Sequence, residues 1–387
     1  MIPYSTQTLL KLDIQGVNNV LKSQWLTQGP IVNKFENNLR KIVKSKYAVA
    51  VNSATSALHI SCLALGLKHG DILWTVPNTF VASANCGLLV GAKIDFVDIN
   101  KNTFNIDSVL LEKKLIKAKK ANRLPKILVP VHFGGQPPEQ DIIWKLSKKF
   151  NFKILEDASH ALGAYYKKEP VGSCKWSDIT VFSFHPVKII TTGEGGAATT
   201  NDIKLHKRLK MFSNHGITKE KKFFKKNTSN AWHYEQQLLG LNYRMNELSA
   251  SLGITQLINL KKFIKLRHQI AKLYYLNLKK DFIQLPTISK NCFSTFHLFV
   301  IKLIGKSEKF HKNFFNFLRK NKINVNVHYI PVHLQPFYSK LGFKKGSFKN
   351  SEEHAKSVIS IPIFPLLKKK EVNKIINLIK NYKKKKF

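Results

Sequence analysis

The feature that most constrains the fold is an alternation, from about residue 46 onward, of short β-rich runs with helical patterns. The expected strands are Tyr47–Val51, Ile72–Val76, Ile94–Val97, Ile127–Phe133, Lys153–Leu155, Ile179–Phe184 and Gly196–Thr199. The expected helices between them include Ser56–Leu65, Val81–Leu89, Ser108–Ala121 and Glu139–Phe150. Strands that alternate with helices predict an α/β domain with a mainly parallel sheet.

The pattern changes near residue 260. A helix-prone stretch, Asn246–Asn277, is followed by a strand at His297–Leu303, a helix at Ser307–Lys320 and a strand at Ile323–His328. A terminal helix places Val372, Ile375, Ile376 and Ile379 on one face. We predict a large α/β domain over residues 1–260, entered by an arm of roughly 45 residues, and a smaller α+β domain over residues 261–387.

The chain of 387 residues carries a formal net charge of +41, which raises the question of a nucleic-acid or membrane partner. The lysines are scattered over nearly every segment, and the one dense block is Lys383 to Lys386, which we expect to be a solvated end. A biased surface composition is therefore the preferred interpretation. A basic nucleic-acid-binding protein that retains an enzyme fold stays open as an alternative.

The four cysteines, Cys62, Cys86, Cys174 and Cys292, lie far apart and match neither a zinc motif nor a disulfide framework. We predict no metal site and a reducing, cytoplasmic location. The N-terminus lacks a signal-peptide pattern, and no apolar run reaches the ~18 residues of a membrane span. The expectation is a protein that is neither exported nor anchored.

The most informative segment is VFSFHPVKIITTGEGG, residues 181–196, in which Lys188 stands among apolar neighbours before a glycine-rich turn. A second segment, FKILEDASHALGA, runs from a buried strand into Asp157 and His160. The carboxyl end of a parallel strand is where α/β sheets bind ligands. An amine that forms a Schiff base and a carboxylate that pairs with a pyridinium nitrogen together suit pyridoxal phosphate. Asp157 as a helix N-cap and His160 as a satisfied buried histidine are the plainer alternatives.

A third segment, AVAVNSATSALHI, places Ser53, Thr55 and Ser56 between a strand and a helix. The free N–H groups and the dipole of a helix N-terminus favour an anion such as phosphate, although such caps are common. Phe80, in PNTFVASAN, is placed either to stack on a cofactor ring or to pack in a core.

These ordered motifs resemble the DegT/DnrJ/EryC1/StrS family, fold-type-I, aspartate-aminotransferase-like enzymes that act on nucleotide sugars. Nearly the whole chain takes part in the resemblance. The matching segments are WLTQGPIVNKFE, NSATSALH, PNTFVASAN, VDINKNTFNID, EDASHALGA, SFHPVKIITTGEGG, LGLNYRMNELSASLGITQL, VNVHYIPVHLQPFY and SIPIFPLL. The implied fold has a mainly parallel, seven-stranded sheet, and the implied cofactor is pyridoxal phosphate.

The resemblance also implies roles for individual residues. Lys188 would hold the cofactor, Asp157 would pair with its ring nitrogen, and His160 would lie near its ring hydroxyl. The other implied cofactor contacts are the stacking Phe80 and the phosphate-binding Ala54, Thr55 and Ser183. Asn242 would reach the phosphate in a neighbouring subunit, which implies a homodimer with shared active sites. Leu241 departs from the aromatic residue that relatives often carry there.

Within the family, WHYEQQLLGLNYRM and NVNVHYIPVHLQPFYSKLGF look most like the aminotransferases of the pseudaminic acid pathway. The implied reaction takes an amino group, with glutamate as the expected donor, to C4 of UDP-2-acetamido-2,6-dideoxy-β-L-arabino-hex-4-ulose. The residues implied to line the sugar-nucleotide pocket are Tyr4, Trp25, Leu26, Thr27, His328 and Tyr329. Aminotransferases for other keto-sugars stay open. A sugar dehydratase is disfavoured because relatives with that chemistry replace the lysine at 188 with histidine.

Overall fold

The computed structural model describes residues 1–225, 230–278 and 281–382, and the tail block Lys383 to Lys386 falls outside them. Its centre is a seven-stranded sheet in the order β1-β9-β8-β5-β4-β2-β3. The strands are β1 (Tyr47–Val51), β2 (Ile72–Thr75), β3 (Lys93–Phe96), β4 (Ile127–Leu128), β5 (Lys153–Asp157), β8 (Ile179–Ser183) and β9 (Gly196–Thr200). All seven strands expected from the alternation are therefore present in one sheet.

The strands from β3 through β2, β4 and β5 to β8 pair in parallel, whereas β9 runs antiparallel to both β8 and β1. Strands β1, β5 and β8 consequently point the same way, and their carboxyl ends meet at one edge. The strand expected over Ile127–Phe133 is shorter, because Pro130 has no N–H to donate to a sheet ladder. A 3₁₀ turn at Phe133–Gly135 (η1) follows it.

The helices expected between the strands are present, with ends shifted by one or two residues. They are α3 (Ala54–Ala64), α4 (Ala82–Leu88), α5 (Ser108–Lys120) and α6 (Gln140–Phe150), and α7 (Ile203–Ser213) follows β9. Side-chain oxygens of Ser53, Asp107 and Asp202 accept hydrogen bonds from N–H groups in the first turns of α3, α5 and α7. These caps satisfy groups that a helix leaves unpaired at its start, so the turn after each strand fixes where its helix begins.

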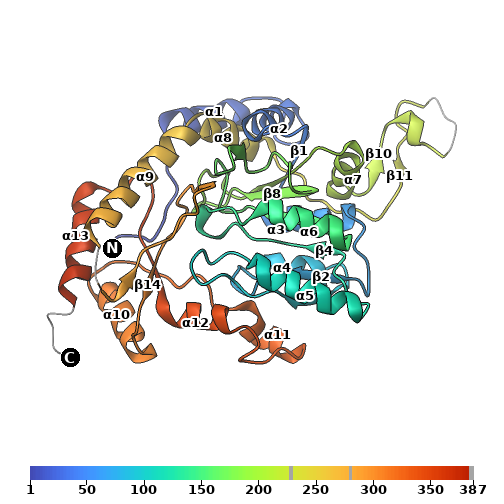
Figure 1. Cartoon of the computed structure of the whole chain (residues 1–387). Coiled ribbons are helices and arrows are strands. Elements are labelled where there is room, and N and C mark those ends of the chain that lie inside the picture. Colours follow the sequence, from blue (N-terminus) through green and yellow to red (C-terminus); the bar gives the residue numbers. More distant parts are fainter. Residues whose placement is uncertain (226–229, 279–280, 383–387) are drawn as a thin grey trace.

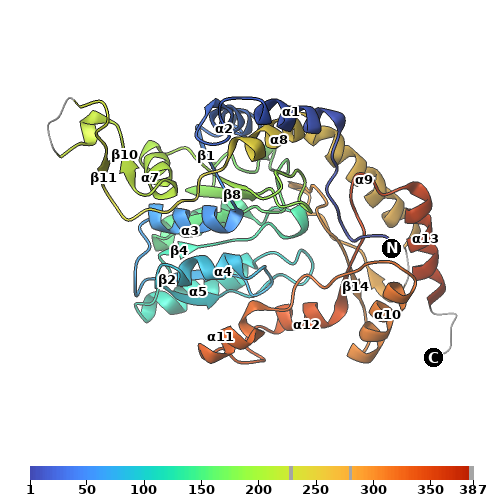
Figure 2. The ribbon, with the colours of Figure 1, turned by 180° about the vertical axis from the view of Figure 1, so that it is seen from behind.

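The N-terminal arm carries two helices, α1 (Lys11–Leu21) and α2 (Pro30–Val43), and both pack against α8 (Glu247–Ile258) along one edge of the molecule (Figures 1 and 2). The stretch expected as one long helix is broken at Asn259, after which α9 (Leu260–Asn277) begins. The Asn259 side chain donates to the carbonyl oxygen of Thr255, which ends α8 locally.

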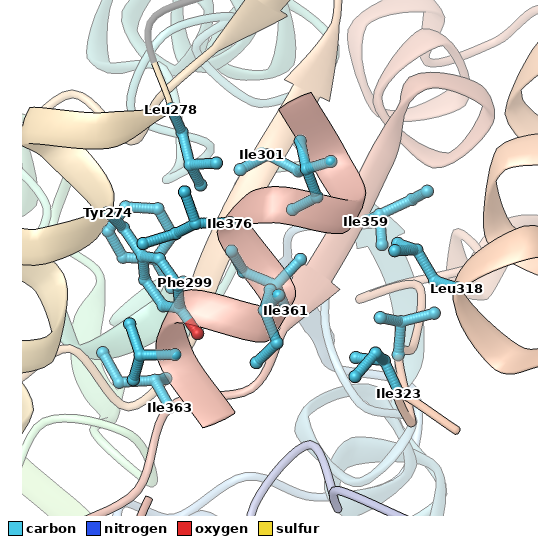
Figure 3. Close-up of a cluster of buried hydrophobic side chains, with 14 of the residues drawn as sticks. Tyr274, Leu278, Phe299, Ile301, Leu318, Ile323, Ile359, Ile361, Ile363 and Ile376 are labelled. Carbon is cyan, nitrogen blue, oxygen red and sulfur yellow. The ribbon is translucent and has the colours of Figure 1, made fainter. Parts of the chain in front are cut away.

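After α9 the chain forms a three-stranded sheet in the order β12-β14-β15. The strands are β12 (Ile283–Gln284), β14 (Phe299–Leu303) and β15 (Val358–Ile361), and the helices of this part are α10 (Glu308–Lys320), α11 (Pro336–Lys340), α12 (Lys349–Ser357) and α13 (Lys369–Asn381). Figure 3 shows the apolar core between them, with Phe299 and Ile361 from the sheet beside Ile376 of α13. The four apolar residues expected on one face of the terminal helix are all buried.

The strand expected at Ile323–His328 is wrong. Ile323 and Val325 are buried, so their alternation reported burial correctly. The segment makes isolated bridges, from Ile323 to Ile2 and from Asn326 to Ser360 at the edge of β15. Beyond Asn326 the chain leaves that edge and passes to the large sheet, because Tyr329 donates its N–H to the side chain of Asn78.

Shorter elements complete the fold. A hairpin of β10 (Ile217–Thr218) and β11 (Glu235–Gln236) projects from the body of the molecule in both views (Figures 1 and 2). A small three-stranded sheet has the order β13-β6-β7. Its strands are β13 (Cys292–Phe293), β6 (Tyr165–Tyr166) and β7 (Glu169–Pro170). Two further 3₁₀ turns are η2 (Lys221–Phe223) and η3 (Val332–Leu334). Among the described residues, no helix is long and apolar enough to span a membrane.

Candidate active site

A cavity of about 650 Å³ lies where the carboxyl ends of β1, β5 and β8 meet. This edge is where ligands bind in parallel sheets, because the loops that leave the strands diverge there. The segment around Tyr329 closes one side of the cavity and Tyr4 of the N-terminal arm lines it as well. Parts of the chain far apart in sequence therefore build one site.

Asp157 is the last residue of β5 and is buried at the base of the cavity. Its Oδ1 accepts hydrogen bonds from the hydroxyl of Ser159 at 2.5 Å and from the N–H of Ser159 at 3.1 Å. Its Oδ2 accepts from the hydroxyl of Ser83 at 2.6 Å. The helix that an N-cap role would require does not follow Asp157, since the next residues form a turn. The carboxylate is therefore held rigidly, with its charge directed to the cavity rather than to a helix.

Lys188 lies five residues beyond the end of β8 and lines the same cavity. The backbone N–H of Lys188 donates to the carbonyl oxygen of His185 at 2.9 Å. The backbone N–H of Thr192 donates to the carbonyl oxygen of Phe184, so hydrogen bonds within the loop fix its shape. Burial lowers the pKa of the Lys188 amine to about 8, although the nearby charge of Asp157 pulls it upward. A lysine with such a pKa is a much better nucleophile at neutral pH than a solvated one.

The N-terminus of α3 forms one end of the cavity, which Ser53, Ala54 and Thr55 line, and the free N–H groups of a helix start suit an anion. Ser53 caps the helix through a hydrogen bond from the N–H of Ser56 at 3.1 Å. Strand β9 approaches this turn closely: a Cβ on Gly196 would lie 2.5 Å from the backbone nitrogen of Ala54. Gly196, the last glycine of the TGEGG segment, is thus required for the close packing of β9 on the start of α3.

His160 connects the turn after β4, at Gly134, with the segment around Tyr329. Its Nδ1 accepts from the N–H of Gly134 at 3.3 Å, and its Nε2 lies 3.2 Å from the hydroxyl of Tyr329. The ring of His297 lies against it with centroids 4.3 Å apart. Because Nδ1 is an acceptor, Nε2 carries the proton and donates to Tyr329. Burial, with the nearby charge of Lys188, lowers the pKa of His160 well below 6.5, so the ring is neutral.

His328, which precedes Tyr329 in the cavity wall, is also neutral. Burial lowers the pKa of His328 to about 3, with a smaller contribution from Lys188. Its Nδ1 lies 2.8 Å from the Ser360 hydroxyl, and its carbonyl oxygen lies 2.8 Å from Nε2 of His354. Burial raises the pKa of Tyr329. These groups offer the cavity uncharged hydrogen-bonding partners, as suits a polar but uncharged ring such as a sugar.

Most of the residues expected at the site line this one cavity. They are Tyr4, Ala54, Thr55, Phe80, Asp157, His160, Ser183, Lys188, His328 and Tyr329. Trp25, Leu26, Thr27 and Asn242 are exposed and do not line it. The carbonyl oxygen of Leu26 accepts the N–H of Glu247, and Asn242 pairs with Asn214, so both segments are anchored outside this chain's own cavity.

The sequence interpretation missed several residues that contact the expected ones, among them Ser83, Ser159 and His297. Ser159 stands two residues after Asp157, where a hydroxyl commonly bonds back to an aspartate, so local spacing offered a signal. Ser83 and His297 come from α4 and from the segment before β14, and no local pattern connects them to Asp157 or His160.

The donor groups of the cavity fit pyridoxal phosphate. Lys188 provides an amine with a lowered pKa and Asp157 a buried carboxylate. The start of α3 provides helix N–H groups for a phosphate, and Phe80 provides an exposed aromatic face at the rim. Among the described residues no group of three or more His, Cys, Asp or Glu side chains could hold a metal ion.

Known proteins show the same architecture. The model of the DegT/DnrJ/EryC1/StrS aminotransferase family matches residues 7–380. A UDP-4-amino-4,6-dideoxy-N-acetyl-beta-L-altrosamine transaminase of Campylobacter jejuni is 39% identical over 363 residues, which are 94% of this chain and 92% of the relative. Among solved structures, Helicobacter pylori PseC, an aminotransferase involved in the biosynthesis of pseudoaminic acid, has a TM-score of 0.90 at 32% identity and covers 99% of this chain and 100% of its own.

A second solved structure is the PLP-form of Spr1654 from Streptococcus pneumoniae, with a TM-score of 0.89 at 28% identity over 99% of this chain and 98% of that one. The expected fold and the expected cofactor are confirmed by these likenesses. The chain therefore belongs to the DegT/DnrJ/EryC1/StrS aminotransferase family, and it is a pyridoxal-phosphate-dependent enzyme of fold type I.

Proposed function

We propose that this enzyme transfers an amino group from glutamate to C4 of a UDP-linked 4-keto-6-deoxy-N-acetylhexosamine. The product would be UDP-4-amino-4,6-dideoxy-N-acetyl-β-L-altrosamine, the sugar in the name of the Campylobacter relative. The observation that carries the chemistry is one cavity at the strand ends that contains both the Lys188 amine and the Asp157 carboxylate. The choice of sugar rests on the likeness to the relatives.

When bound, pyridoxal phosphate supplies an aldehyde that accepts amines and a ring that withdraws electrons. Lys188 is the residue proposed to hold it. With a pKa of about 8, about one amine in ten is neutral at pH 7, against roughly one in three thousand at the ordinary value. The same amine, once free, is placed to take a proton at Nζ from the substrate carbon and to return it.

The other cavity residues are proposed to bind and orient. Asp157 would keep the ring nitrogen protonated, and the start of α3 with Thr55 and Ser183 would hold the phosphate. His160 would lie near the ring hydroxyl, with its Nε2 proton directed to Tyr329. Tyr4, His328 and Tyr329 would contact the sugar as uncharged hydrogen-bonding groups.

We also propose that the active unit is a homodimer. Phe80 at the cavity rim is 60% exposed, and Trp25, implied to bind sugar nucleotide, is 52% exposed away from the cavity. The projecting β10–β11 hairpin carries Trp232 at 78% exposure, and Leu239, three residues beyond β11, is 84% exposed. Exposed large apolar groups support an interaction surface where they gather into a patch. A second copy that brings Trp25 and Asn242 to the rim would complete each site.

Complementation tests this arrangement. In a dimer with shared sites, Lys188→Ala subunits lack only the amine and Asn242→Ala subunits lack only the group given to the neighbour. Mixed after dissociation, the two inactive or weakened variants should recover activity, because one site in each heterodimer has both groups. A mixture with no more activity than its components, together with a monomeric mass in solution, would contradict the homodimer.

The reaction is tested by incubating the purified protein with glutamate and a panel of UDP- and dTDP-linked keto-sugars. Amination of the UDP-linked 4-keto-6-deoxy-N-acetylhexosamine at C4, with release of 2-oxoglutarate and ping-pong kinetics, is expected. Faster turnover of another keto-sugar would move the assignment within the family. Loss of a sugar hydroxyl without amine transfer would favour a dehydratase.

The four cysteines are free thiols in the structure, as suits a reducing cytoplasm. The division into a large domain and a small one near residue 260 is proposed from the separate apolar core that α9 and the chain after it form, together with Ile2 of the arm. We propose small-molecule substrates and no specific nucleic-acid partner, so any DNA binding should vanish at moderate salt while amination persists.

A further inference from the structure

The carboxylate of Asp157 is contacted from behind by a residue that nothing above assigns to the reaction. Ser83 lies in α4, is fully buried, and donates its hydroxyl to Oδ2 of Asp157 at 2.6 Å. The hydroxyl of Thr79 lies 2.8 Å from the hydroxyl of Ser83. Thr79 lines the cavity, whereas Ser83 does not. Three buried polar groups thus form a line that ends at the carboxylate.

The direction of the hydrogen bonds in this line follows from the chemistry of its last member. An ionised carboxylate only accepts, so the single hydroxyl hydrogen of Ser83 is used toward Asp157. Thr79 must then donate to Ser83, since Ser83 has no second hydrogen. The chain runs one way, from Thr79 through Ser83 to Asp157, and hydrogen bonds aligned in this manner strengthen one another.

Helix α4 holds Ser83 in place by packing tightly on the sheet. A Cβ on Gly87 would lie 2.6 Å from Cδ1 of Ile94, so the helix sits as close as a residue without a side chain permits. Two residues after Ser83 in the same helix, Asn85 accepts a hydrogen bond from the hydroxyl of Tyr338 at 2.6 Å. The position of the Ser83 hydroxyl is therefore set by the fold and is independent of any ligand.

We propose that Ser83 and Thr79 are positioning residues, which fix the orientation of the Asp157 carboxylate and hold its negative charge toward the ring nitrogen of the cofactor. The inference rests on the proposed role of Asp157. Without the donated hydrogen, the carboxylate keeps its two bonds from Ser159 at Oδ1 but loses the bond that holds Oδ2. The ring nitrogen is then less fully protonated, and electron withdrawal by the ring weakens.

The test compares Ser83→Ala, Thr79→Ala and Thr79→Ser with the wild type. Ser147→Ala is the matched control, because Ser147 is also buried and bonds within its own helix, α6, to the carbonyl oxygen of Trp144. Each protein is loaded with pyridoxal phosphate, checked by absorbance, and examined by NMR for the proton on the ring nitrogen. Steady-state kinetics then separate kcat from KM, and thermal melting checks folding.

Ser83→Ala should move the ring N–H signal. It should lower kcat about tenfold, because one hydrogen bond to a charged group is lost, and it should change KM little. Thr79→Ala should act in the same direction but less, and Thr79→Ser and Ser147→Ala should match the wild type. If Ser83→Ala fails to fold, Ser83→Cys keeps the volume with a weaker donor, and an intermediate shift is expected.

A loaded Ser83→Ala or Ser83→Cys protein with the ring N–H signal of the wild type would overturn this inference alone. The proposed role of Asp157 fails differently. In that case the wild type itself would show no ring N–H signal, or Asp157→Asn would leave that signal unchanged. The first result would overturn only the proposed role of Ser83 and Thr79. The second would also overturn the proposed role of Asp157, on which the first depends.

Discussion

Glu156 and Asp157 are neighbours on strand β5, and side chains of successive strand residues point to opposite faces of a sheet. Both carboxylates are buried. Asp157 lies at the cavity, where its partners are hydroxyl and N–H groups from Ser83 and Ser159. Glu156 lies on the other face, where Thr180 donates to it at 2.6 Å and Nε2 of His132 lies 3.4 Å away.

The difference shows how burial alone fails to identify a functional carboxylate. Burial raises the pKa of Glu156, but the charge of His132 and the hydrogen bonds from Thr180 and Gln140 outweigh it, so the pKa is lowered overall. Glu156 has its polar partners in the protein interior. Asp157 is left to attract a cation in the cavity, which is the arrangement that a pyridinium nitrogen requires.

The largest effect that would break this comparison concerns the amine on the cavity side. Lys188→Ala should lower kcat by at least about a thousandfold, because it removes both the attachment point and the acid–base group. It should also remove the imine absorbance of the purified protein. Lys175→Ala, which removes a surface lysine paired with Glu169, is the control. Full activity in the Lys188 variant would remove the central assignment.

Replacing each carboxylate in turn sharpens the comparison directly. Asp157→Asn should keep the fold and lower kcat on the order of a hundredfold. Glu156→Gln should keep kcat per folded molecule but lower the free energy of unfolding by about 3–5 kcal/mol, because His132 loses its buried partner. Activity assays and denaturant melts measure the two. Equal catalytic losses in both variants would show that the faces do not differ in function.

The pH dependence of cofactor capture by the apoenzyme separates the two carboxylates again. Because the pKa of Lys188 is about 8, the rate of capture should rise roughly fiftyfold from pH 6 to pH 8 as the amine loses its proton, and then level off. Asp157 raises this pKa, so Asp157→Asn should move the midpoint to lower pH, while Glu156→Gln should leave it in place. Stopped-flow absorbance follows the capture.

The smallest expected effect on catalysis concerns Tyr329, in the cavity wall. Tyr329→Phe removes the hydroxyl that lies 3.2 Å from His160, and kcat/KM for the keto-sugar should fall about tenfold. Cofactor capture should be unchanged. Tyr275→Phe is the matched control, since its hydroxyl bonds to the carbonyl oxygen of Pro286 outside the cavity. An equal loss in the control would mean that the tyrosine acts through stability.

Local periodicity was sufficient to locate the strands of the large sheet, because most of them are short, buried runs bounded by turns. It failed where a tertiary contact decided the outcome. The residues around Val325 have the alternation of a strand, yet β15 (Val358–Ile361) takes the place beside β14. The break at Asn259 depends on one side-chain hydrogen bond, which a helical pattern does not report.

That Lys188 and Asp157 share one cavity was predictable, because Asp157 ends a strand and Lys188 lies in the loop after another strand of the same sheet. Ser83 and His297 were not, because each acts through a neighbour distant in sequence: Ser83 is 74 residues from Asp157. Which of the two carboxylates at 156 and 157 faces the cavity follows from strand register, and register is set by pairing with β8.

The sequence by itself determined the fold class and the family motifs, and it predicted an amine and a carboxylate that the structure brings to one cavity, since these depend on local pattern and residue type. The tertiary structure alone decided how each polar group is satisfied: the hydroxyls behind Asp157, the proton position on His160 and the burial that lowers the pKa of Lys188. The physical reason is that hydrogen bonding and desolvation depend on what surrounds a group in space.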